Sequence, residues 1–414
     1  MLTFDQGSIG TTTYQLAATG GSTKSVTVNL GTAISDSVTF GTLALQGGNG
    51  AVDGIGTVSL VSNGLDFTSG DAIANTNTVT ALTDTGLKNL NVSGTQGLTI
   101  SDITVTGDTL AIGNTNTGHA GLVITSLSDS SLGNLTFTGT GNNVITTLAD
   151  TIPNLTIANN GTGTAAITNT FTSATLQNLT LTGNVGLTLV DTYAGTTIAA
   201  GTDNAHLNIT LGTGTNSVTV GNANNVIVGG TGVDTITVGT GRNLITGLDG
   251  ADVISFGTHT AGNNIVYTTA ASSVSATGAN VDVLNNFNTT VDKIQLTAGG
   301  LSALLSGITL TAGTTSAATM LSAITDTTSV ATIGNVYTQL ATDLLNTTVG
   351  HEFAASANTA LGLVAREVIF TTGAAAGTYL VINDSTAGFN GTNDLVIKLV
   401  GTTTVAAGDI IVHA

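Results

Sequence analysis

The chain has 414 residues, of which only 7% are charged, whereas roughly a quarter are charged in an average soluble protein. Six basic residues face 24 acidic residues, which gives a formal net charge of −18. Charge of this sign repels phosphate backbones and anionic lipids, so the composition argues against nucleic acid as a partner.

The residue types favour strands and turns. Threonine, valine and isoleucine favour strands, and 55 glycines together with many asparagines supply turns. The chain has no cysteine, so a long extracellular protein of this kind needs repeat stacking or a bound metal for its stability. No run of 18 apolar residues predicts a membrane span, and the N-terminal residues lack the regions of a Sec signal. Met1 is either a native N-terminus or the start of a shortened chain.

A degenerate repeat covers residues 1–200. Its core reads aliphatic-x-Asn-Leu-x-apolar and occurs at residues 87–92, 132–137, 152–157 and 176–181. The aligned asparagines, at 89, 134, 154 and 178, suit coils of 20 to 24 residues, with one unmatched coil in the first gap. Apolar and polar residues alternate in each copy, which predicts a parallel β-solenoid. We expect the asparagines to stack as a hydrogen-bonded ladder inside the coils.

From Leu211 to Ser255 the repeat length becomes nine. Each of five consecutive copies has Asp or Asn at its sixth position and Val or Ile at its eighth. The sixth positions are Asn216, Asn225, Asp234, Asn243 and Asp252. This run resembles the consensus G-G-x-G-x-D-x-U-x of the RTX (repeats-in-toxin) family, where U is a large aliphatic residue. The resemblance implies a calcium-binding β-roll in which two nonapeptides form one turn.

Such a turn would place loops 18 residues apart above one another and stack Asp234 over Asp252. Stacked carboxylates repel unless a hard cation with oxygen ligands lies between them, and Ca²⁺ meets this need best. We expect one good site formed by both aspartates and the loop carbonyls at Thr231–Gly232 and Asp249–Gly250. A weaker site would pair Asn216 with Asp234. The alternative is a series of Asx turns without any ion.

On the opposite edge of the roll Asn225 and Asn243 are neutral, so we expect this column to stack by amide hydrogen bonds without metal.

Residues 281–296 resemble the aspartate-rich D-x-I-x-x-F…D-x-I-x-L element that follows RTX repeats. This resemblance implies that Asp282 and Asp292 are further calcium ligands or cap residues. Exposed turn aspartates are the alternative.

Beyond Gly300 the repeats end. Apolar residues in 318–328 and 336–347 have the spacing of helices, and residues 367–372, 378–382 and 394–400 indicate strands, which together predict a small mixed α/β cap. Residues 383–394 resemble a degraded EF-hand loop in which Ala387 replaces a ligand. The resemblance makes Asp384 and Asp394 candidate ligands.

Residues 409–414, an acid followed by aliphatic residues, resemble the uncleaved C-terminal signal of RTX exoproteins. This implies export by a type I secretion apparatus, and a buried terminal strand is the alternative.

His351–Glu352 begin like the zinc-protease helix H-E-x-x-H, but Ala355 replaces the second histidine. Neither G-x-S-x-G nor G-x-G-x-x-G occurs, so we expect no enzyme.

The acidic, Thr-, Gly- and Asn-rich solenoid with an RTX end resembles the type I secreted S-layer proteins of Gram-negative bacteria. This implies an extracellular, cell-surface protein that forms a calcium-dependent lattice with its own copies and reaches lipopolysaccharide through a region outside this chain. An RTX adhesin, including the ice-binding kind, and the carrier domain of a secreted enzyme are the alternatives.

The expected fold is therefore all-β, in three parts. Residues 1–200 form a right-handed parallel β-helix, residues 201–270 form an RTX β-roll, and residues 271–414 form the cap with the secretion signal.

Overall fold

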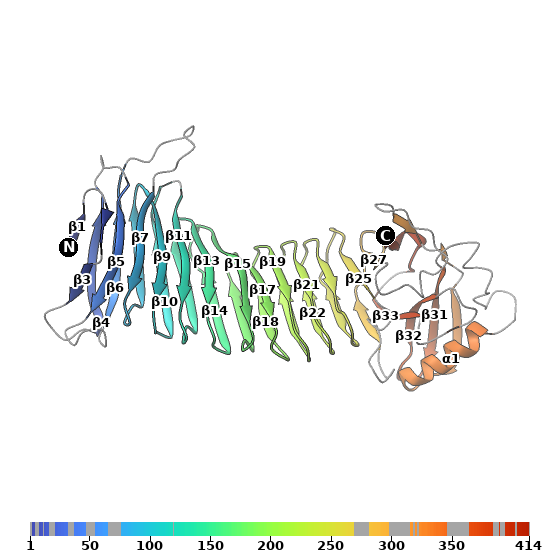
Figure 1. Cartoon of the computed structure of the whole chain (residues 1–414). Helices are drawn as coiled ribbons and strands as arrows, with labels where there is room; N and C mark the ends of the chain where they lie inside the picture. The colour runs from blue at the N-terminus through green and yellow to red at the C-terminus, as the bar shows by residue number, and fades with distance from the viewer. Residues whose placement is uncertain are drawn as a thin grey trace. The chain divides into compact units, whose positions relative to one another are not determined.

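The computed structural model describes residues 2–4, 8–10, 12–15, 21–31, 37–46, 54–64, 76–118, 120–268, 281–297, 315–317, 319–320, 323–345, 364–383, 389, 394–401 and 404–413. The chain divides into two compact units. Unit 1 comprises Met1–Tyr193 with Ile198–His206, and unit 2 comprises Ala194–Thr197 with Leu207–Ala414. Each unit is built mainly from parallel strands, as Figure 1 shows.

Unit 1 is a parallel solenoid of two sheets. The first sheet contains β1 (Leu2–Phe4), β4 (Gly21–Leu30), β6 (Ile55–Ser62), β8 (Asn89–Gly94), β10 (Thr109–Asn114), β12 (Asn134–Gly139), β14 (Asn154–Asn159), β16 (Asn178–Thr182) and β18 (Thr197–Thr202). The second contains β2 (Ser8–Ile9), β3 (Thr12–Gln15), β5 (Thr39–Gln46), β7 (Thr76–Thr83), β9 (Gly97–Thr104), β11 (Leu122–Ser128), β13 (Asn143–Ala149), β15 (Ala165–Ser173) and β17 (Val185–Asp191). The predicted parallel solenoid is confirmed.

Aliphatic side chains stacked from coil to coil fill the interior of unit 1. One row in the second sheet is in register across five strands and is at most 4% exposed; it consists of Ile100, Ile124, Ile145, Ile167 and Leu187. Full burial of each such side chain contributes about 1.5–3 kcal/mol. The stacked rows therefore hold the coils together without disulfides.

The repeat asparagines do not lie inside these coils. The asparagines that open β8, β12, β14 and β16 all have exposed side chains. Asn178 donates a 2.7 Å hydrogen bond to Asn154 one coil away, but Asn134 pairs with Thr156, so the four asparagines are not in one register. The predicted interior ladder is wrong, because side chains alternate along a strand and the leucine after each asparagine takes the inward position.

Coil length varies within unit 1. Asn154 and Asn178 are 24 residues apart, as the repeat predicts. Earlier coils are longer, since Thr57 and its partner Asn89 are 32 residues apart.

Unit 2 contains the nonapeptides and the C-terminal residues. Its first sheet has the parallel strands β20 (Ser217–Val220), β22 (Thr235–Val238), β24 (Val253–Phe256), β26 (Asp282–Asn285) and β33 (Leu395–Val400). The sheet goes on through β32 (Gly377–Asn383), β31 (Val364–Thr372), β30 (Ile324–Ser329) and β29 (Thr319–Met320). The second sheet has β19 (Leu207–Thr210), β21 (Val226–Val228), β23 (Leu244–Thr246), β25 (Asn264–Tyr267), β27 (Lys293–Thr297), β34 (Ile410–His413) and β28 (Thr315–Ala317).

The eighth positions of the nonapeptides form two buried rows. One row extends into the C-terminal strands and consists of Val218, Ile236, Ile254, Leu284 and Leu399. The other does the same and consists of Ile209, Ile227, Ile245, Ile265, Ile294 and Ile410. The nonapeptide coils and the C-terminal strands therefore share one core.

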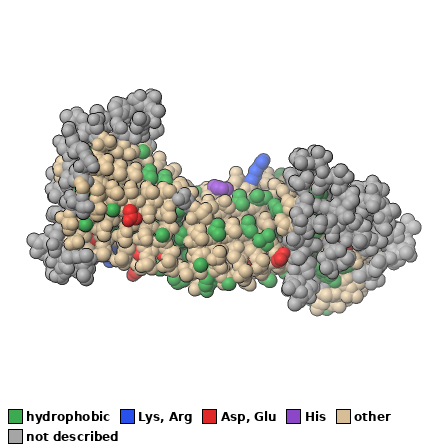
Figure 2. Space-filling model, in the orientation of Figure 1, with side chains coloured by type: hydrophobic (Ala, Val, Ile, Leu, Met, Phe, Trp, Pro, Cys, Tyr) green, Lys and Arg blue, Asp and Glu red, His purple; other side chains and the backbone are tan. Residues whose placement is uncertain are grey.

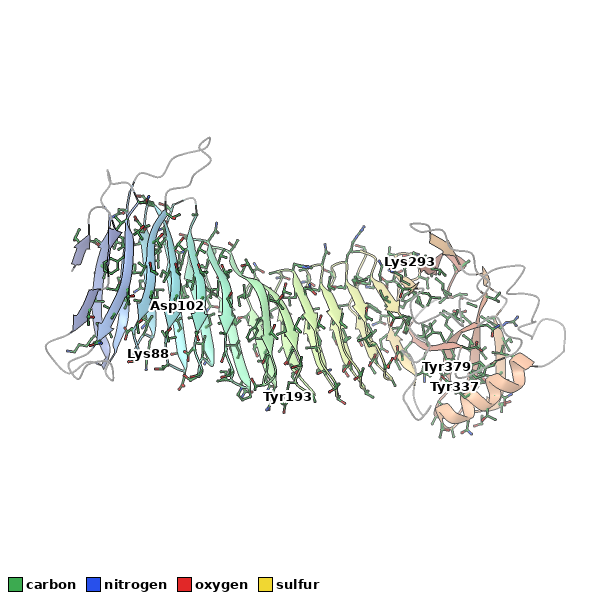
Figure 3. All side chains as sticks on the ribbon, in the orientation of Figure 1. Lys88, Asp102, Tyr193, Lys293, Tyr337 and Tyr379 are labelled. Carbon is green, nitrogen blue, oxygen red and sulfur yellow. The ribbon has the colours of Figure 1, made fainter. Side chains whose placement is uncertain are left out.

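The C-terminal part of unit 2 is the predicted mixed cap. Helix α1 (Ile333–Leu345) confirms the second expected helix and buries Val336, Leu340 and Leu344 against β31 and β32. Tyr337 of α1 and Tyr379 of β32 belong to the same packed cluster (Figure 3). The first expected helix is wrong, because residues 324–329 form β30, whose β-branched residues pair with β31.

The chain end is the buried terminal strand that the sequence left as an alternative. Strand β34 pairs with β27, Ile410 and Val412 are fully buried, and Lys293 forms a 3.0 Å ion pair with Asp409 of the 3-10 helix η2 (Ala407–Asp409). Export by a type I apparatus stays a prediction.

Candidate cation site

The sixth positions of the nonapeptides form two buried columns in unit 2. We call them the carboxylate column, which contains Asn216, Asp234, Asp252 and Asp282, and the amide column, which contains Asn225, Asn243, Asn263 and Asp292. Successive nonapeptide members of a column are 18 residues apart, and every member is at most 3% exposed. The predicted stacking of Asp234 and Asp252 is therefore present.

Hydrogen bonds between loops hold the carboxylate column in register. The backbone amide of each member donates to the side chain of the next: Asn216 to Asp234 Oδ1 at 2.8 Å, Asp234 to Asp252 Oδ1 at 2.8 Å, and Asp252 to Asp282 Oδ1 at 2.7 Å. One carboxylate oxygen of each aspartate is used in this way. Asp282 is thus the third carboxylate of the column, and the alternative of an exposed turn residue is wrong.

The second oxygens of Asp234 and Asp252 have no hydrogen-bond partner, although both atoms are buried. Each faces the space where the first glycine of its own loop lacks a side chain. A Cβ atom on Gly229 would lie 2.5 Å from Asp234 Oδ2 and 3.1 Å from the carbonyl oxygen of Gly247, and a Cβ on Gly247 would crowd Asp252 Oδ2. Glycine is therefore required at both positions, because the carboxylate oxygen packs against its Cα atom. A buried carboxylate oxygen without a donor is the kind of ligand that a hard cation such as Ca²⁺ takes.

The first residue of the nonapeptide differs between the loops of Asp234 and Asp252 and the loops of Asn225 and Asn243, while Leu211 begins the loop of Asn216. Gly229 and Gly247 begin loops of the carboxylate column, whereas Val220 and Val238 begin loops of the amide column and are buried. This alternation of glycine and valine at the first position is visible in the sequence.

Burial makes ionised carboxylates unfavourable in the carboxylate column. It raises the pKa of Asp234 to about 6. The pKa of Asp252 is raised to about 7, mainly by burial and also by the charges of Asp234 and Asp249, while the hydrogen bond from the Asp234 amide lowers it. The pKa of Asp282 is raised well above its usual value by burial and then by the charge of Asp252. A bound cation would remove this penalty by neutralising the charges.

The expected carbonyl ligands have other partners. The carbonyl oxygen of Thr231 accepts a 2.8 Å hydrogen bond from the Gly214 amide, and that of Asp249 accepts a 2.7 Å bond from Gly232. Gly232 and Gly250 have φ values of +137° and +155°, and a side chain on either would clash with the preceding loop. The structure therefore gives Thr231, Gly232, Asp249 and Gly250 a role in loop stacking.

The expected weaker site between Asn216 and Asp234 contains an amide contact instead. Asn216 Nδ2 donates 3.0 Å hydrogen bonds to Asp234 Oδ1 and to the Gly229 carbonyl. These amide hydrogens stand where a cation would have to approach, so this end of the column does not fit a metal ion.

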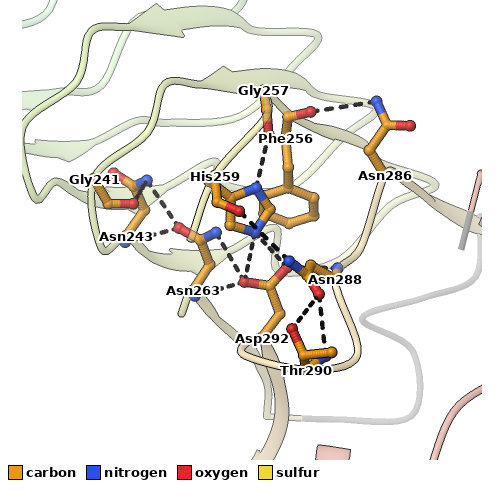
Figure 4. A network of polar contacts seen from close by, with 10 residues as sticks. All are labelled: Gly241, Asn243, Phe256, Gly257, His259, Asn263, Asn286, Asn288, Thr290 and Asp292. Carbon is orange, nitrogen blue, oxygen red and sulfur yellow. Dashed lines mark hydrogen bonds and ion pairs between the residues drawn. The ribbon is translucent and has the colours of Figure 1, made fainter. Parts of the chain in front are cut away.

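The amide column shows the hydrogen bonds that the sequence predicted. Asn225 donates to Asn243 Oδ1 from both its backbone and its side-chain nitrogen, each at 3.1 Å. Asn243 does the same to Asn263 Oδ1 at 2.9 Å, and Asn263 to Asp292 Oδ1 at 2.7 and 2.9 Å. Figure 4 shows the lower part of this column.

Asp292 ends the amide column and does not fit a metal. Its Oδ1 also contacts His259 Nε2 at 3.0 Å, while Oδ2 contacts His259 Nε2 at 2.9 Å and the Asn288 amide at 2.8 Å. Every oxygen is thus occupied by donors. Asp292 is a buried cap residue, which agrees with one of the two roles implied by the RTX resemblance.

The structure describes only part of the EF-hand-like segment, residues 383–394. Asp384 lies outside the described residues, and Asp394 is fully buried at the start of β33. His351 and Glu352 are also outside the described residues.

Within the described ranges, no group of three or more His, Cys, Asp or Glu side chains is arranged to hold a metal ion, so any site here depends on backbone oxygens as well. None of the helices described is long and apolar enough to cross a membrane.

In comparisons with known proteins, no family model matches the chain, and no curated protein or solved structure is significantly similar to it.

Proposed function

We propose that this protein is a calcium-dependent structural protein that assembles with its own copies into a surface layer on a bacterial cell. The observation that carries the proposal is the pair of buried, unbonded carboxylate oxygens of Asp234 and Asp252 beside Gly229 and Gly247. Calcium bound there would supply positive charge to the carboxylate column. The chain itself orients Asp234 and Asp252 through the hydrogen bonds between successive loops.

The surface supports repeated contacts between identical copies. One face carries few charged side chains (Figure 2), and outward positions of the strands are often Thr or Asn, as at Asn134 and Thr136 of β12. Repeated coils present the same kind of surface many times, and heterologous contacts between such copies extend into arrays when they do not close. Divalent ions between acidic side chains would strengthen these contacts.

The cell-surface location belongs to the same proposal. It is supported by the resemblance of the nonapeptides to those of type I secreted RTX proteins. Anchoring to lipopolysaccharide would require a region outside this chain. Deleting residues 409–414 would test export, but the readout must include circular dichroism, because Ile410 and Val412 are also part of the core.

Electron microscopy and light scattering of the purified protein, with millimolar calcium and with chelator, test assembly. We expect crystalline sheets with calcium and their dissolution on chelation. The matched control is the double variant Asp234→Asn with Asp252→Asn, which should not respond to calcium. Monomers that persist at high protein and calcium concentrations would contradict the surface layer and favour an RTX adhesin.

A further inference from the structure

The amide column ends in a buried network around His259 (Figure 4). The imidazole contacts two partners: Nδ1 lies 2.7 Å from the carbonyl oxygen of Gly257, and Nε2 lies 2.9 and 3.0 Å from the two oxygens of Asp292. The side chains of His259 and Asp292 are 2% and 0% exposed. Bulk solvent therefore reaches neither group.

Both partners of the imidazole are hydrogen-bond acceptors. A carbonyl oxygen carries no hydrogen, so Nδ1 must donate to Gly257. Asp292 already accepts hydrogen bonds from the backbone and side chain of Asn263 and from the Asn288 amide, and three such donors favour an ionised carboxylate. Nε2 must then donate as well, and only the imidazolium form carries a hydrogen on both ring nitrogens.

Asp292 is the charged partner of His259. In the part of the chain that the structure describes, Asp292 is the single titratable side chain in contact with His259, and the neighbouring Lys293 is paired with Asp409. The other groups that contact His259 are uncharged: the Gly257 carbonyl, and the Asn288 side-chain amide, which donates to the backbone carbonyl of His259. The Phe256 ring lies 5.8 Å from the imidazole, centroid to centroid, and is tilted by 48° to it.

We propose that His259 is a protonated, resident counter-ion that takes the place of a metal ion at Asp292. One edge of unit 2 then contains its own cation, whereas the carboxylate column depends on a cation from solution. The second half of this statement rests on the proposed calcium function. The first half concerns only the charge of His259 and holds with or without calcium.

The first test compares His259→Gln, Asp292→Asn and the double variant by thermal unfolding, in calcium and in chelator. His259→Gln should lower the melting temperature by several degrees in both media, because it leaves the Asp292 charge buried without a partner. Adding Asp292→Asn should recover most of that loss, since an amide needs no counter-ion. A melting temperature unchanged by His259→Gln, or a double variant no better than His259→Gln, would overturn the proposal.

Calcium titration by calorimetry of Asp292→Asn separates the two halves of the proposal. The resident cation predicts the same number of bound calcium ions as in the unchanged protein. Loss of one ion would make Asp292 a calcium ligand and would overturn the inference. If no calcium binds to either protein, the calcium function fails, while the variant series in chelator still decides the charge of His259.

A direct measurement determines the protonation state of the imidazole in the unchanged protein. Selective ¹⁵N labelling of the five histidines should show one imidazole with hydrogens on both ring nitrogens at neutral pH, protected from solvent exchange. His259→Gln assigns that signal by removing it. If the buried imidazole shows the nitrogen shifts of a neutral tautomer, the proposal is overturned.

Discussion

The carboxylate and amide columns use one backbone arrangement with two different side-chain chemistries. In both, the amide of each sixth residue donates to the side-chain oxygen of the next loop. An asparagine side chain then donates its own hydrogens within the column, whereas an aspartate leaves Oδ2 without a donor. The choice between Asp and Asn thus decides whether every side-chain oxygen and nitrogen of a loop finds a partner within the column, and it is the unpartnered oxygens for which we propose a cation.

The first position of the nonapeptide agrees with this division. Glycine begins the loops of Asp234 and Asp252, and valine begins those of Asn225 and Asn243. Glycine therefore stands where the unpartnered oxygen of Asp234 or Asp252 packs against the backbone. Asp292 is a carboxylate in the amide column, and there His259 serves as its counter-ion.

Removing calcium should have the largest effect on this contrast. A site that binds calcium only in the folded state contributes about 4 kcal/mol when calcium is present at 1,000 times its dissociation constant. We expect chelation to lower the melting temperature measured by circular dichroism. The double variant Asp234→Asn with Asp252→Asn serves as the control and should unfold at one temperature in both media. Equal melting of the unchanged protein with and without chelator would remove the calcium role.

Gly247→Val should convert a loop of the carboxylate column to the form found in the amide column. Gly247 has no positive φ, so the backbone accepts a side chain, but the new Cβ would crowd Asp252 Oδ2. We expect calcium affinity to fall about 100-fold, which corresponds to roughly 3 kcal/mol. Calorimetry would measure it, with Gly247→Val in an Asp252→Asn background as the control. Unchanged affinity would place the ion elsewhere.

The pH dependence of the calcium-free protein would test the buried carboxylates. The folded-state pKa values of about 6 for Asp234 and about 7 for Asp252 lie above the ordinary value of 3.8. Because the folded state then binds more protons than the unfolded state, stability is lost as pH rises through 6 and 7. We expect a loss on the order of 2 kcal/mol between about pH 5 and pH 8.

Denaturant unfolding in chelator at several pH values measures this slope. Millimolar calcium should reduce the slope, because calcium binds the ionised carboxylates of the column. The part that remains comes from carboxylates outside the column, such as Asp84 and Asp150, whose pKa burial also raises to about 6. Stability that instead rises from pH 5 to pH 8 without calcium would show that another cation already neutralises the column.

Asn225→Ala should have the smallest effect and should not depend on calcium. The substitution leaves the Leu207 amide, which donates to Asn225 Oδ1 at 3.0 Å, without a partner. A loss of about 1–3 kcal/mol is expected, equal in calcium and in chelator. Asp234→Ala, by contrast, should reduce calcium affinity in calorimetry. Equal loss of calcium affinity in both variants would contradict the separation of the columns.

The period of the sequence predicted much of the fold. A strict repeat of nine with an aliphatic eighth position is enough to predict stacked coils with a buried row, since each short strand can bury only one face. The same repeat predicted that Asp234 lies above Asp252. Local spacing was less informative in the degenerate region, where Asn134 was aligned with Asn154 but pairs with Thr156. Coils of unequal length change the register, and the sequence repeat alone does not specify it.

The sequence by itself therefore determined the parallel solenoid, the two columns and the candidate calcium ligands, because these features repeat at fixed intervals along the chain. Only the tertiary structure decided the features that depend on single, distant contacts. Residues 324–329 became a strand through pairing with β31, although their apolar spacing is that of a helix. His259 and Asp292 are 33 residues apart and belong to no sequence repeat. Their side chains come into contact only because two loops end at the same edge of unit 2. Periodic order can be predicted from sequence, whereas a buried ion pair depends on which distant loops the folded chain brings together.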